Sequence, residues 1–171
     1  MCIRDSYYTL YQQRNTELWI EYGEGKITKD ELNCQRFFYP LQAVGVEDEA
    51  LAEQFSKDFF AIIPTKSTLM PHAKEVLEYL APKYNLYILS NGFRELQSCK
   101  MRSAGVDGYF KKVILSEDLG VLKPWPAIFN FALSATQSEL RESLMIGDSW
   151  EADITGAHGV GTVSYTHLTL P

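Results

Sequence analysis

Short apolar runs alternate with helix-like segments along the second half of this 171-residue chain, and this alternation restricts the fold more than any other feature. The apolar runs are predicted strands, at residues 85–90, 111–116 and 143–146. Helical spacing of apolar residues is found at 71–80, 93–104 and 124–135, with a further helix expected after residue 148. Because strands separated by helices pair in parallel, the sequence predicts a doubly wound, parallel α/β sheet.

Burial is expected along these elements. The helix that begins near Pro71 carries Val76, Leu77 and Leu80 on one face, which we expect to point inward. Residues 143–146 are expected to form a short buried strand, because the run is apolar and short. The core would then lie between the sheet and its helices.

The first third of the chain has helical periodicity only. One helix is predicted over residues 7–22, and a second begins at a capping box formed by Thr28 and Glu31 and ends before Pro40. A third is predicted over residues 47–62, with acidic residues at its start, where the helix dipole favours them. The sequence therefore predicts an all-helical unit ahead of the α/β part.

Polar residues stand at the carboxyl ends of the predicted strands, where ligands bind in open α/β sheets. Ser90 ends the first strand, and its hydroxyl with the Asn91 and Gly92 amides can donate hydrogen bonds to phosphate oxygens. Lys123 precedes a helix, and its ammonium can neutralise a phosphoryl group. Asp148 follows the third strand. Together they predict a phosphoryl-transfer site that lacks its nucleophile.

Two carboxylates accompany the third strand. Asp148 follows it directly and Asp153 lies five residues further on, in the expected helix. Carboxylates suit Mg²⁺, which prefers oxygen ligands. We expect Asp148 to bind this metal and Asp153 to hold Asp148 or Lys123 in place. The alternative for Asp148 is that it only caps the following helix.

The other site residues also have a purely structural interpretation. Ser90, Asn91 and Gly92 are favoured turn residues and could form only a turn. Lys123 taken alone resembles a solvated surface lysine. The specificity lies in the joint pattern.

Composition excludes several classes of protein. A net charge of −6 argues against a nucleic-acid-binding surface, and no apolar run reaches membrane-spanning length. No secretory signal pattern is found. The three cysteines are odd in number and unevenly spaced, which is typical of a reducing cytoplasm. We expect a cytoplasmic protein that binds neither membranes nor nucleic-acid polymers.

Both ends of the chain read as foreign sequence. Residues 1–6 and 163–171 resemble translations of the two strands of a DNA-sequencing adapter, so we exclude both from functional interpretation. Residues 162–165 are strand-like and could imitate the next native strand, which would be an accident. The part between the adapters is expected to be an internal piece of a longer protein.

Three motifs occur in a recognisable order: Leu86-Tyr-Ile-Leu-Ser90, Lys123-Pro124, and Gly147-Asp148 with Asp153. The chain thereby resembles the haloacid dehalogenase-like (HAD) hydrolases with a helical cap. Two further sets of residues are similar to the branch of pyrimidine-nucleotide 5'-nucleotidases: Trp19-x2-Tyr22 with Arg36-Phe37, and Ser90-Asn-Gly-Phe93-x2-Leu96-Gln97.

The resemblance implies a cap over residues 7–65 and a partial Rossmann-like core over residues 66–162. It also implies a Mg²⁺-dependent phosphatase that hydrolyses nucleoside 5'-monophosphates through an aspartyl-phosphate. Phosphate would be held by Ser90, Asn91, Gly92 and Lys123, the metal by Asp148, and neighbouring groups would be oriented by Asp153. Candidates for contact with base or ribose, or for the cap core alone, are Trp19, Tyr22, Arg36 and Phe37.

One departure from the family is important. Its first motif, Asp-x-Asp on the first strand, supplies nucleophile and general acid/base, and it is absent here. That strand would lie in the middle of the sheet, between the strands that lead to Ser90 and Asp148. We therefore expect a sheet without its first central strand, and a chain that folds poorly and has no phosphatase activity of its own.

Other functions stay open at this point. Within the same superfamily these are a phosphoglycolate- or sugar-phosphate-type phosphatase and a phosphomutase. A noncatalytic binding module is a further alternative. A receiver-like signalling domain also has Asp, Ser or Thr, and Lys at strand ends, but the long helical segment at the start of this chain argues against it.

Overall fold

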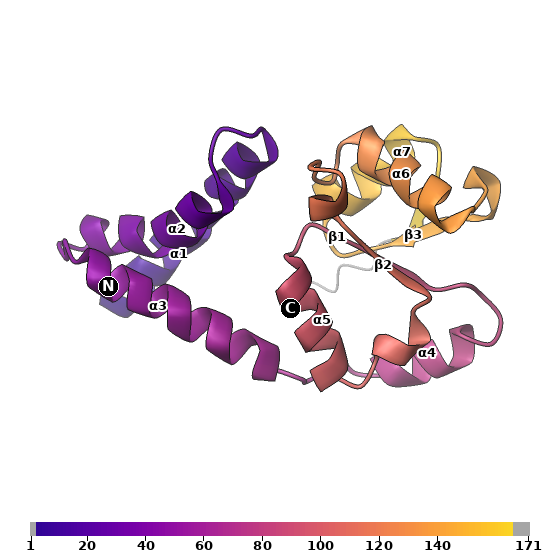
Figure 1. The fold of residues 1–171 in the computed structure, drawn as a ribbon, viewed down its shortest axis with the longest axis horizontal. Helices are drawn as coiled ribbons and strands as arrows, with labels where there is room; N and C mark the ends of the chain where they lie inside the picture. The colour runs from indigo at the N-terminus through magenta and orange to yellow at the C-terminus, as the bar shows by residue number, and fades with distance from the viewer. Residues whose placement is uncertain (1–2, 166–171) are drawn as a thin grey trace. The chain divides into compact units, whose positions relative to one another are not determined.

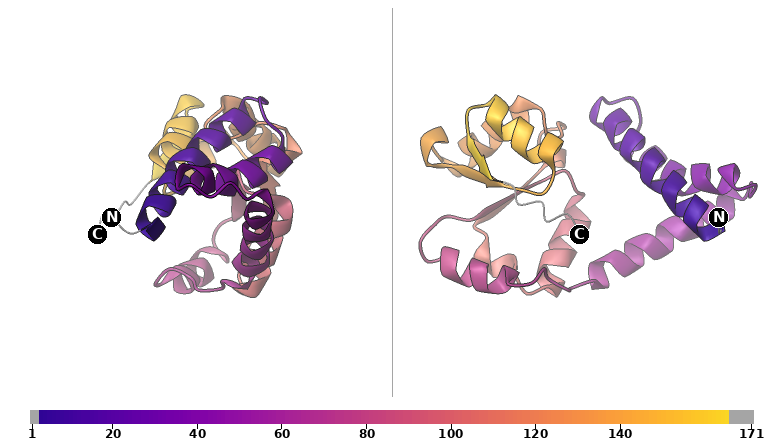
Figure 2. Two further views of the ribbon diagram at one scale, coloured as in Figure 1. Left: turned by 90° about the vertical axis from the view of Figure 1, so that its left-hand side faces the viewer. Right: turned by 180° about the vertical axis from the view of Figure 1, so that it is seen from behind.

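The computed structural model describes residues 3–165 (Figure 1). The chain divides between Lys66 and Ser67 into two compact units. The first unit contains helices only, whereas the second combines helices and strands, as the two views of Figure 2 also show. In the described part of the chain, no helix has both the length and the apolar character that crossing a membrane requires.

Three long helices make up the first unit, as predicted. They are α1 (Ile3–Gly23), α2 (Lys29–Ala43) and α3 (Glu49–Ile62), and the short 3-10 turn η1 (Ile63–Thr65) follows. Helix α2 packs against both α1 and α3. Helix α1 begins at Ile3, ahead of the predicted start at Tyr7, so some residues assigned to the adapter continue the helix.

The capping box predicted at Thr28 and Glu31 opens α2. The Thr28 hydroxyl accepts a hydrogen bond from the Glu31 N–H at 3.2 Å, and the Glu31 carboxylate accepts one from the Thr28 N–H at 2.7 Å. These bonds pair two amides that would otherwise have no partner at a helix start. The Thr28 N–H and the Thr28 hydroxyl both donate to the Glu31 carboxylate, and they lower the pKa of Glu31 because they stabilise its charged form.

The prediction that α2 ends before Pro40 is wrong. Pro40 lies inside the helix, which continues to Ala43. Proline has no N–H and therefore cannot bond to the carbonyl of Arg36 one turn earlier. The missing bond falls in the last turn, where Pro40 and Leu41 are both buried. Packing against the core of the unit therefore keeps this turn helical.

Aromatic rings join the three helices of the first unit. Phe37, Leu41 and Ala52 form the buried centre. The Phe37 ring of α2 stacks on Tyr11 of α1 at a centroid distance of 5.5 Å, and meets Phe59 of α3 at 5.4 Å. Such ring pairs add to the stabilisation from apolar burial, so Phe37 links all three helices.

Helices and strands alternate along the second unit. The strands are β1 (Tyr87–Ser90), β2 (Lys112–Leu115), β3 (Leu144–Ile146) and β4 (Val163–Tyr165). The helices are α4 (Ala73–Leu80), α5 (Arg94–Ser103), α6 (Pro126–Thr136) and α7 (Gly156–Gly159). A π-helical turn, η5 (Trp150–Thr155), leads into α7, and 3-10 turns occur at η2 (Asp107–Tyr109), η3 (Ser116–Asp118) and η4 (Leu140–Glu142). All three predicted strands are present, and a fourth, β4, falls on the strand-like residues at the end of the described chain.

The strands pair in parallel, as predicted, but in two separate sheets. Strand β1 pairs with β2, so that Ser90 lies opposite Leu115. Strand β3 pairs with β4, so that Leu144 lies opposite Val163. Within residues 3–165, β1 and β3 are not paired with each other. This break falls between the strands that lead to Ser90 and Asp148, where a central strand is expected to be missing.

One face of the β3–β4 sheet is covered and the other is open. Met145 packs against Ile128, Phe129 and Ala157 of α6 and α7. The side chains of the opposite face are more than half exposed, and they are Leu144, Ile146, Val163 and Tyr165. The prediction of a buried strand over residues 143–146 is therefore wrong, because the described residues cover only one of its faces.

The prediction for α4 is also wrong in part. The helix begins at Ala73, after His72, whose φ of 63° lies in the left-handed region and interrupts the helix. Leu77 and Leu80 are half-buried, but Val76 is exposed. Val76 therefore does not point inward, because the described residues leave that side of α4 open.

Candidate functional site

Ser90 is the last residue of β1, and its hydroxyl is held in a turn. The Ser90 Oγ accepts a hydrogen bond from the Gly92 N–H at 3.0 Å and another from the side-chain amide of Gln97. The side chain is half-buried. The predicted turn is therefore present, and it fixes the hydroxyl at the carboxyl end of the strand.

Asn91 ties this turn to the segment that carries Lys123. The Asn91 Oδ1 accepts a hydrogen bond from the Lys123 N–H at 2.8 Å, and Asn91 Nδ2 donates to the Lys123 carbonyl at 3.1 Å. Its own carbonyl accepts a bond from Ser116 Oγ at 3.2 Å. The Asn91 side chain therefore positions the main chain of Lys123. Of the two Asn91 amides, only the main-chain N–H remains for the predicted contact with phosphate.

Lys123 reaches the open edge of β1. The Leu86 carbonyl accepts a hydrogen bond from the Lys111 N–H on the side of β2. Because carbonyl directions alternate along a strand, the Leu89 carbonyl points to the opposite edge. Lys123 Nζ donates to this carbonyl at 2.9 Å. The ammonium therefore occupies the edge of β1 that no described strand pairs.

The same ammonium forms a buried ion pair with Asp153. Lys123 Nζ lies 2.6 Å from Asp153 Oδ1, and the two side chains are only 11% and 5% exposed. Lys123 is therefore not a solvated surface lysine. Asp153 Oδ2 accepts a bond from the Ser149 N–H at 3.1 Å. Both carboxylate oxygens have partners, so Asp153 holds Lys123 and the loop after β3 together.

Gly147 allows Asp153 to come this close. A Cβ at Gly147 would lie 2.3 Å from Asp153 Oδ2 and 2.6 Å from its Cβ, far inside contact distance. Any side chain at residue 147 would therefore displace the Asp153 carboxylate from its partners.

Asp148 is exposed at the start of the loop after β3. It does not cap the following helix. Ser149 does so, because its side chain accepts a hydrogen bond from the Ala152 N–H at 3.1 Å. Among residues 3–165, no cluster of three or more His, Cys, Asp or Glu side chains has the geometry of a metal site. Asp148 is thus a single exposed carboxylate, which lies five residues before Asp153 of the buried ion pair.

These contacts bring the ends of β1 and β3 together. Lys123 bonds to Leu89 in β1 and to Asp153 beyond β3, and Asn91 fixes the Lys123 main chain. The result is a cation fixed on the Leu89 carbonyl and a hydroxyl fixed on the next residue, Ser90, at the carboxyl end of β1. Such an arrangement can bind a tetrahedral anion.

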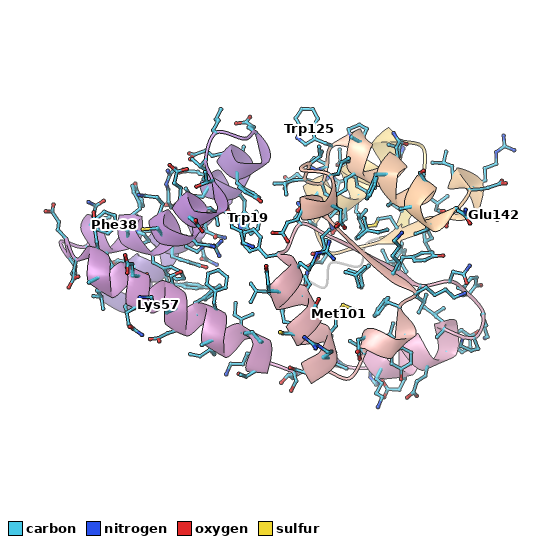
Figure 3. The ribbon with its side chains drawn as sticks, in the orientation of Figure 1. Trp19, Phe38, Lys57, Met101, Trp125 and Glu142 are labelled. Carbon is cyan, nitrogen blue, oxygen red and sulfur yellow. The ribbon has the colours of Figure 1, made fainter. Side chains whose placement is uncertain are left out.

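The candidate specificity residues all lie in the first unit, where Figure 3 labels Trp19. Phe37 belongs to the core, and Trp19 and Tyr22 are half-buried, with their rings edge-on at 5.9 Å. Arg36 is buried, and its guanidinium lies 5.8 Å from the Trp19 ring centre. Burial lowers the pKa of Arg36, and contact with Tyr11 opposes that shift.

Comparison with known proteins decides the family. The family model for haloacid dehalogenase-like hydrolases matches residues 4–161. The chain belongs to the haloacid dehalogenase-like (HAD) hydrolases.

Individual HAD hydrolases show how close the similarity is. The pyrimidine 5'-nucleotidase YjjG of Escherichia coli is 34% identical over 88% of this chain. The ribulose-1,5-bisphosphate 5-phosphatase of Halopiger xanaduensis is 37% identical over 55% of this chain and 40% of its own. The crystal structure of the HAD-hydrolase YfnB of Bacillus subtilis, bound to magnesium, aligns with a TM-score of 0.83 and 32% identity, covering 92% of this chain and 70% of that one.

The HAD relatives are longer than the chain. The matched region spans 64% of the YfnB sequence and 66% of the YjjG sequence. The predicted fold class is nevertheless confirmed, since the alignment with YfnB includes both the helices of the first unit and the parallel strands of the second.

Three contacts of the candidate site are not among the sequence predictions. They are the Gln97 side chain on Ser90, the Asn91 side chain on the Lys123 main chain, and Ser149 as helix cap. Serine is a preferred capping residue, so a signal for Ser149 existed. The Asn91 contact joins residues 32 positions apart, for which local sequence carries no signal.

Proposed function

We propose that the whole protein is a Mg²⁺-dependent phosphatase that hydrolyses nucleoside 5'-monophosphates, preferentially those of pyrimidines, through an aspartyl-phosphate. The observation that carries this proposal is the buried ammonium of Lys123, held between Leu89 and Asp153 beside the Ser90 turn. A fixed cation and fixed donors stabilise the charge that develops during phosphoryl transfer. Similarity to YjjG supports the choice of nucleotide substrate.

Each site residue has a role in this proposal. The Ser90 hydroxyl, the Asn91 main-chain amide and the Lys123 ammonium would hold the phosphoryl group. The Gly92 N–H, also expected to do so, is instead bonded to Ser90 Oγ. Asp153 would orient Lys123, because both of its oxygens are engaged with Lys123 and Ser149. The nucleophile would be an aspartate, and the 171 residues contain no Asp-x-Asp motif that could supply it. We therefore expect no turnover by this chain alone.

Asp148 fits the proposed Mg²⁺ as one ligand. Mg²⁺ is commonly bound through one or two carboxylates together with water and substrate phosphate. Asp148 is exposed, whereas Asp153 is already paired with Lys123. When bound, Mg²⁺ would supply positive charge next to the phosphoryl oxygens. The magnesium named in the YfnB structure supports this choice of metal.

Residues 7–65 of the first unit are proposed to act as a cap that selects the leaving group of the substrate. Trp19 and Tyr22 are half-buried and offer rings for stacking on a base. Arg36 has a buried Nη2 without a hydrogen-bond partner among the described residues, so a carbonyl oxygen of a base would satisfy it. Phe37 would support these residues from the core. Residues 1–6 and 163–171 stay outside the proposal.

A substrate panel on the whole protein tests the proposal. We expect the highest kcat/KM for pyrimidine nucleoside monophosphates with Mg²⁺, and loss of nearly all metal-dependent turnover in Asp148→Ala. Full activity of Asp148→Ala would remove this carboxylate from the site. The free thiols of Cys34 and Cys99 fit the proposed cytoplasmic location.

A sugar-phosphate phosphatase is the second candidate. The similarity to the Halopiger ribulose-1,5-bisphosphate 5-phosphatase supports it over about half of the chain. The same panel separates the two, because a sugar bisphosphate would then be turned over faster than any nucleotide.

A further inference from the structure

We propose that Gln97 is a positioning residue that forces the Ser90 hydroxyl to act as a hydrogen-bond donor toward a phosphoryl oxygen. The inference rests on the proposed function, since it assigns a role within the same phosphate site. It explains why a glutamine from α5 lies against the end of β1.

Ser90 Oγ accepts two hydrogen bonds, so only its own O–H is available for a further one. A serine hydroxyl has one donor proton and two acceptor lone pairs. The Gly92 N–H occupies one lone pair at 3.0 Å, and the Gln97 side-chain amide occupies the other. The remaining O–H can only donate, and the hydrogen bonds found within residues 3–165 give it no acceptor. A phosphoryl oxygen, which offers only acceptor lone pairs, is a partner that such a hydroxyl fits.

Gly92 gives Gln97 the space to reach Ser90. A Cβ at Gly92 would lie 2.8 Å from Gln97 Nε2 and 3.2 Å from its Cδ. The φ angle of Gly92 is not in the left-handed region, so the backbone itself does not require glycine. Gly92 and Gln97 therefore act as one unit, in which the glycine provides room and the glutamine provides the donor.

The start of α5 is fixed, which fixes Gln97. The Gln97 N–H donates to the Phe93 carbonyl at 3.0 Å in the first turn. The Arg94 N–H donates to the Glu117 carboxylate at 2.7 Å, and the Arg94 guanidinium pairs with Asp118. These contacts tie α5 to η3, so the glutamine is presented to Ser90 from a rigid element.

Binding of inorganic phosphate to the chain tests this role. The affinity can be followed by NMR through the amide signals of Ser90 and Gly92. We expect Gln97→Met, which keeps the length of the side chain, to weaken binding about 2- to 10-fold, the usual net value of one hydrogen bond. Gly92→Ala should weaken it similarly, and the double variant should lose no more than either single one. Gln54→Met, at an exposed position of α3, is the matched control.

A Ser90→Ala background separates positioning from general damage. Without the hydroxyl, Gln97→Met should have no further effect on phosphate affinity, whereas structural damage would still reduce it. Equal affinity of Gln97→Met and the unmodified chain would remove the role of Gln97 and leave the phosphate site standing. Failure of the unmodified chain to bind phosphate, while its amide spectrum shows the dispersion of a folded protein, would remove the phosphate site itself, and with it this role.

Discussion

Lys123 and Asp153 are the two residues on which the site depends most. Their ion pair is almost fully buried, and each partner has a further hydrogen bond, to Leu89 and Ser149. A buried pair of this kind contributes little over an apolar pair of the same shape, but removing one member leaves the other charge without compensation.

Asp153→Asn should therefore lower the free energy of unfolding by about 3 kcal/mol, because it leaves the Lys123 ammonium buried and unpaired. Urea unfolding followed by circular dichroism measures this loss. Glu53→Gln is the matched control, since Glu53 pairs with Lys57 on an exposed helix surface and its loss should cost less than about 0.5 kcal/mol. Equal losses in the two variants would contradict the burial argument.

The places of single residues in the fold could be predicted further than their contacts. Ser90 at the end of β1 and Asp148 after β3 follow from short apolar runs, and Lys123 from its position before a helix. The acceptor of Lys123 could not be predicted, because Leu89 lies 34 residues earlier in the chain. The role of Gln97 depends on the missing side chain of Gly92, and only three-dimensional coordinates reveal this.

Secondary-structure elements follow the sequence where a local signal starts or stops them. The capping box of Thr28 and Glu31 is of this kind, and it opens α2 as predicted. Because the pKa of Glu31 is lowered in the folded chain, its contribution is present above the ordinary pKa of a glutamate and is lost as pH falls through the lowered value.

Glu31→Ala should therefore lower the thermal midpoint of the chain at pH 7, because the charged carboxylate no longer accepts the Thr28 N–H. The difference from the unmodified chain should vanish in acid, where Glu31 is protonated in both states. Thermal unfolding at several pH values measures it. Asp30→Asn is the control, since it removes charge from the same turn and keeps the box; a difference that persists in acid would rule out the carboxylate as its source.

Element burial was predicted less well than element type. Pro40 was expected to end α2, but the packing of its last turn overrides this local signal. Residues 144 and 146 were expected to be buried, but they are exposed, because burial depends on which segments cover a sheet. Local periodicity identifies a strand and does not identify what lies on its two faces.

The molecule as a whole exposes an apolar sheet face. Leu144, Ile146, Val163 and Tyr165 lie side by side on one face of the β3–β4 sheet, and each is more than half exposed. Contiguous apolar surface of this kind favours association between molecules. Within residues 3–165, β1 and β3 each have an edge that no strand pairs, and such edges add to this tendency because their backbone groups can pair with another chain.

Ile146→Thr should therefore reduce self-association without loss of stability, because threonine keeps the preference for a strand and is less apolar. Sedimentation velocity over a range of concentrations measures association, and urea unfolding measures stability. Met145→Thr is the matched control, because the neighbouring side chain packs on α6 and α7, and its replacement should lower stability. Equal association of Ile146→Thr and the unmodified chain would contradict a role for the open face.

Lys123 Nζ binds the Leu89 carbonyl oxygen on the edge of β1, so the addition of a strand at this edge would compete with that hydrogen bond. A peptide that extends the sheet from this edge would donate its own N–H to the Leu89 carbonyl and compete there with Lys123 Nζ. An ammonium displaced from this carbonyl would have a second hydrogen to offer to an anion. By thermodynamic linkage, an anion that attracts the ammonium makes the same edge easier to extend. Completion of the sheet and recognition of phosphate would thus promote each other through a single lysine.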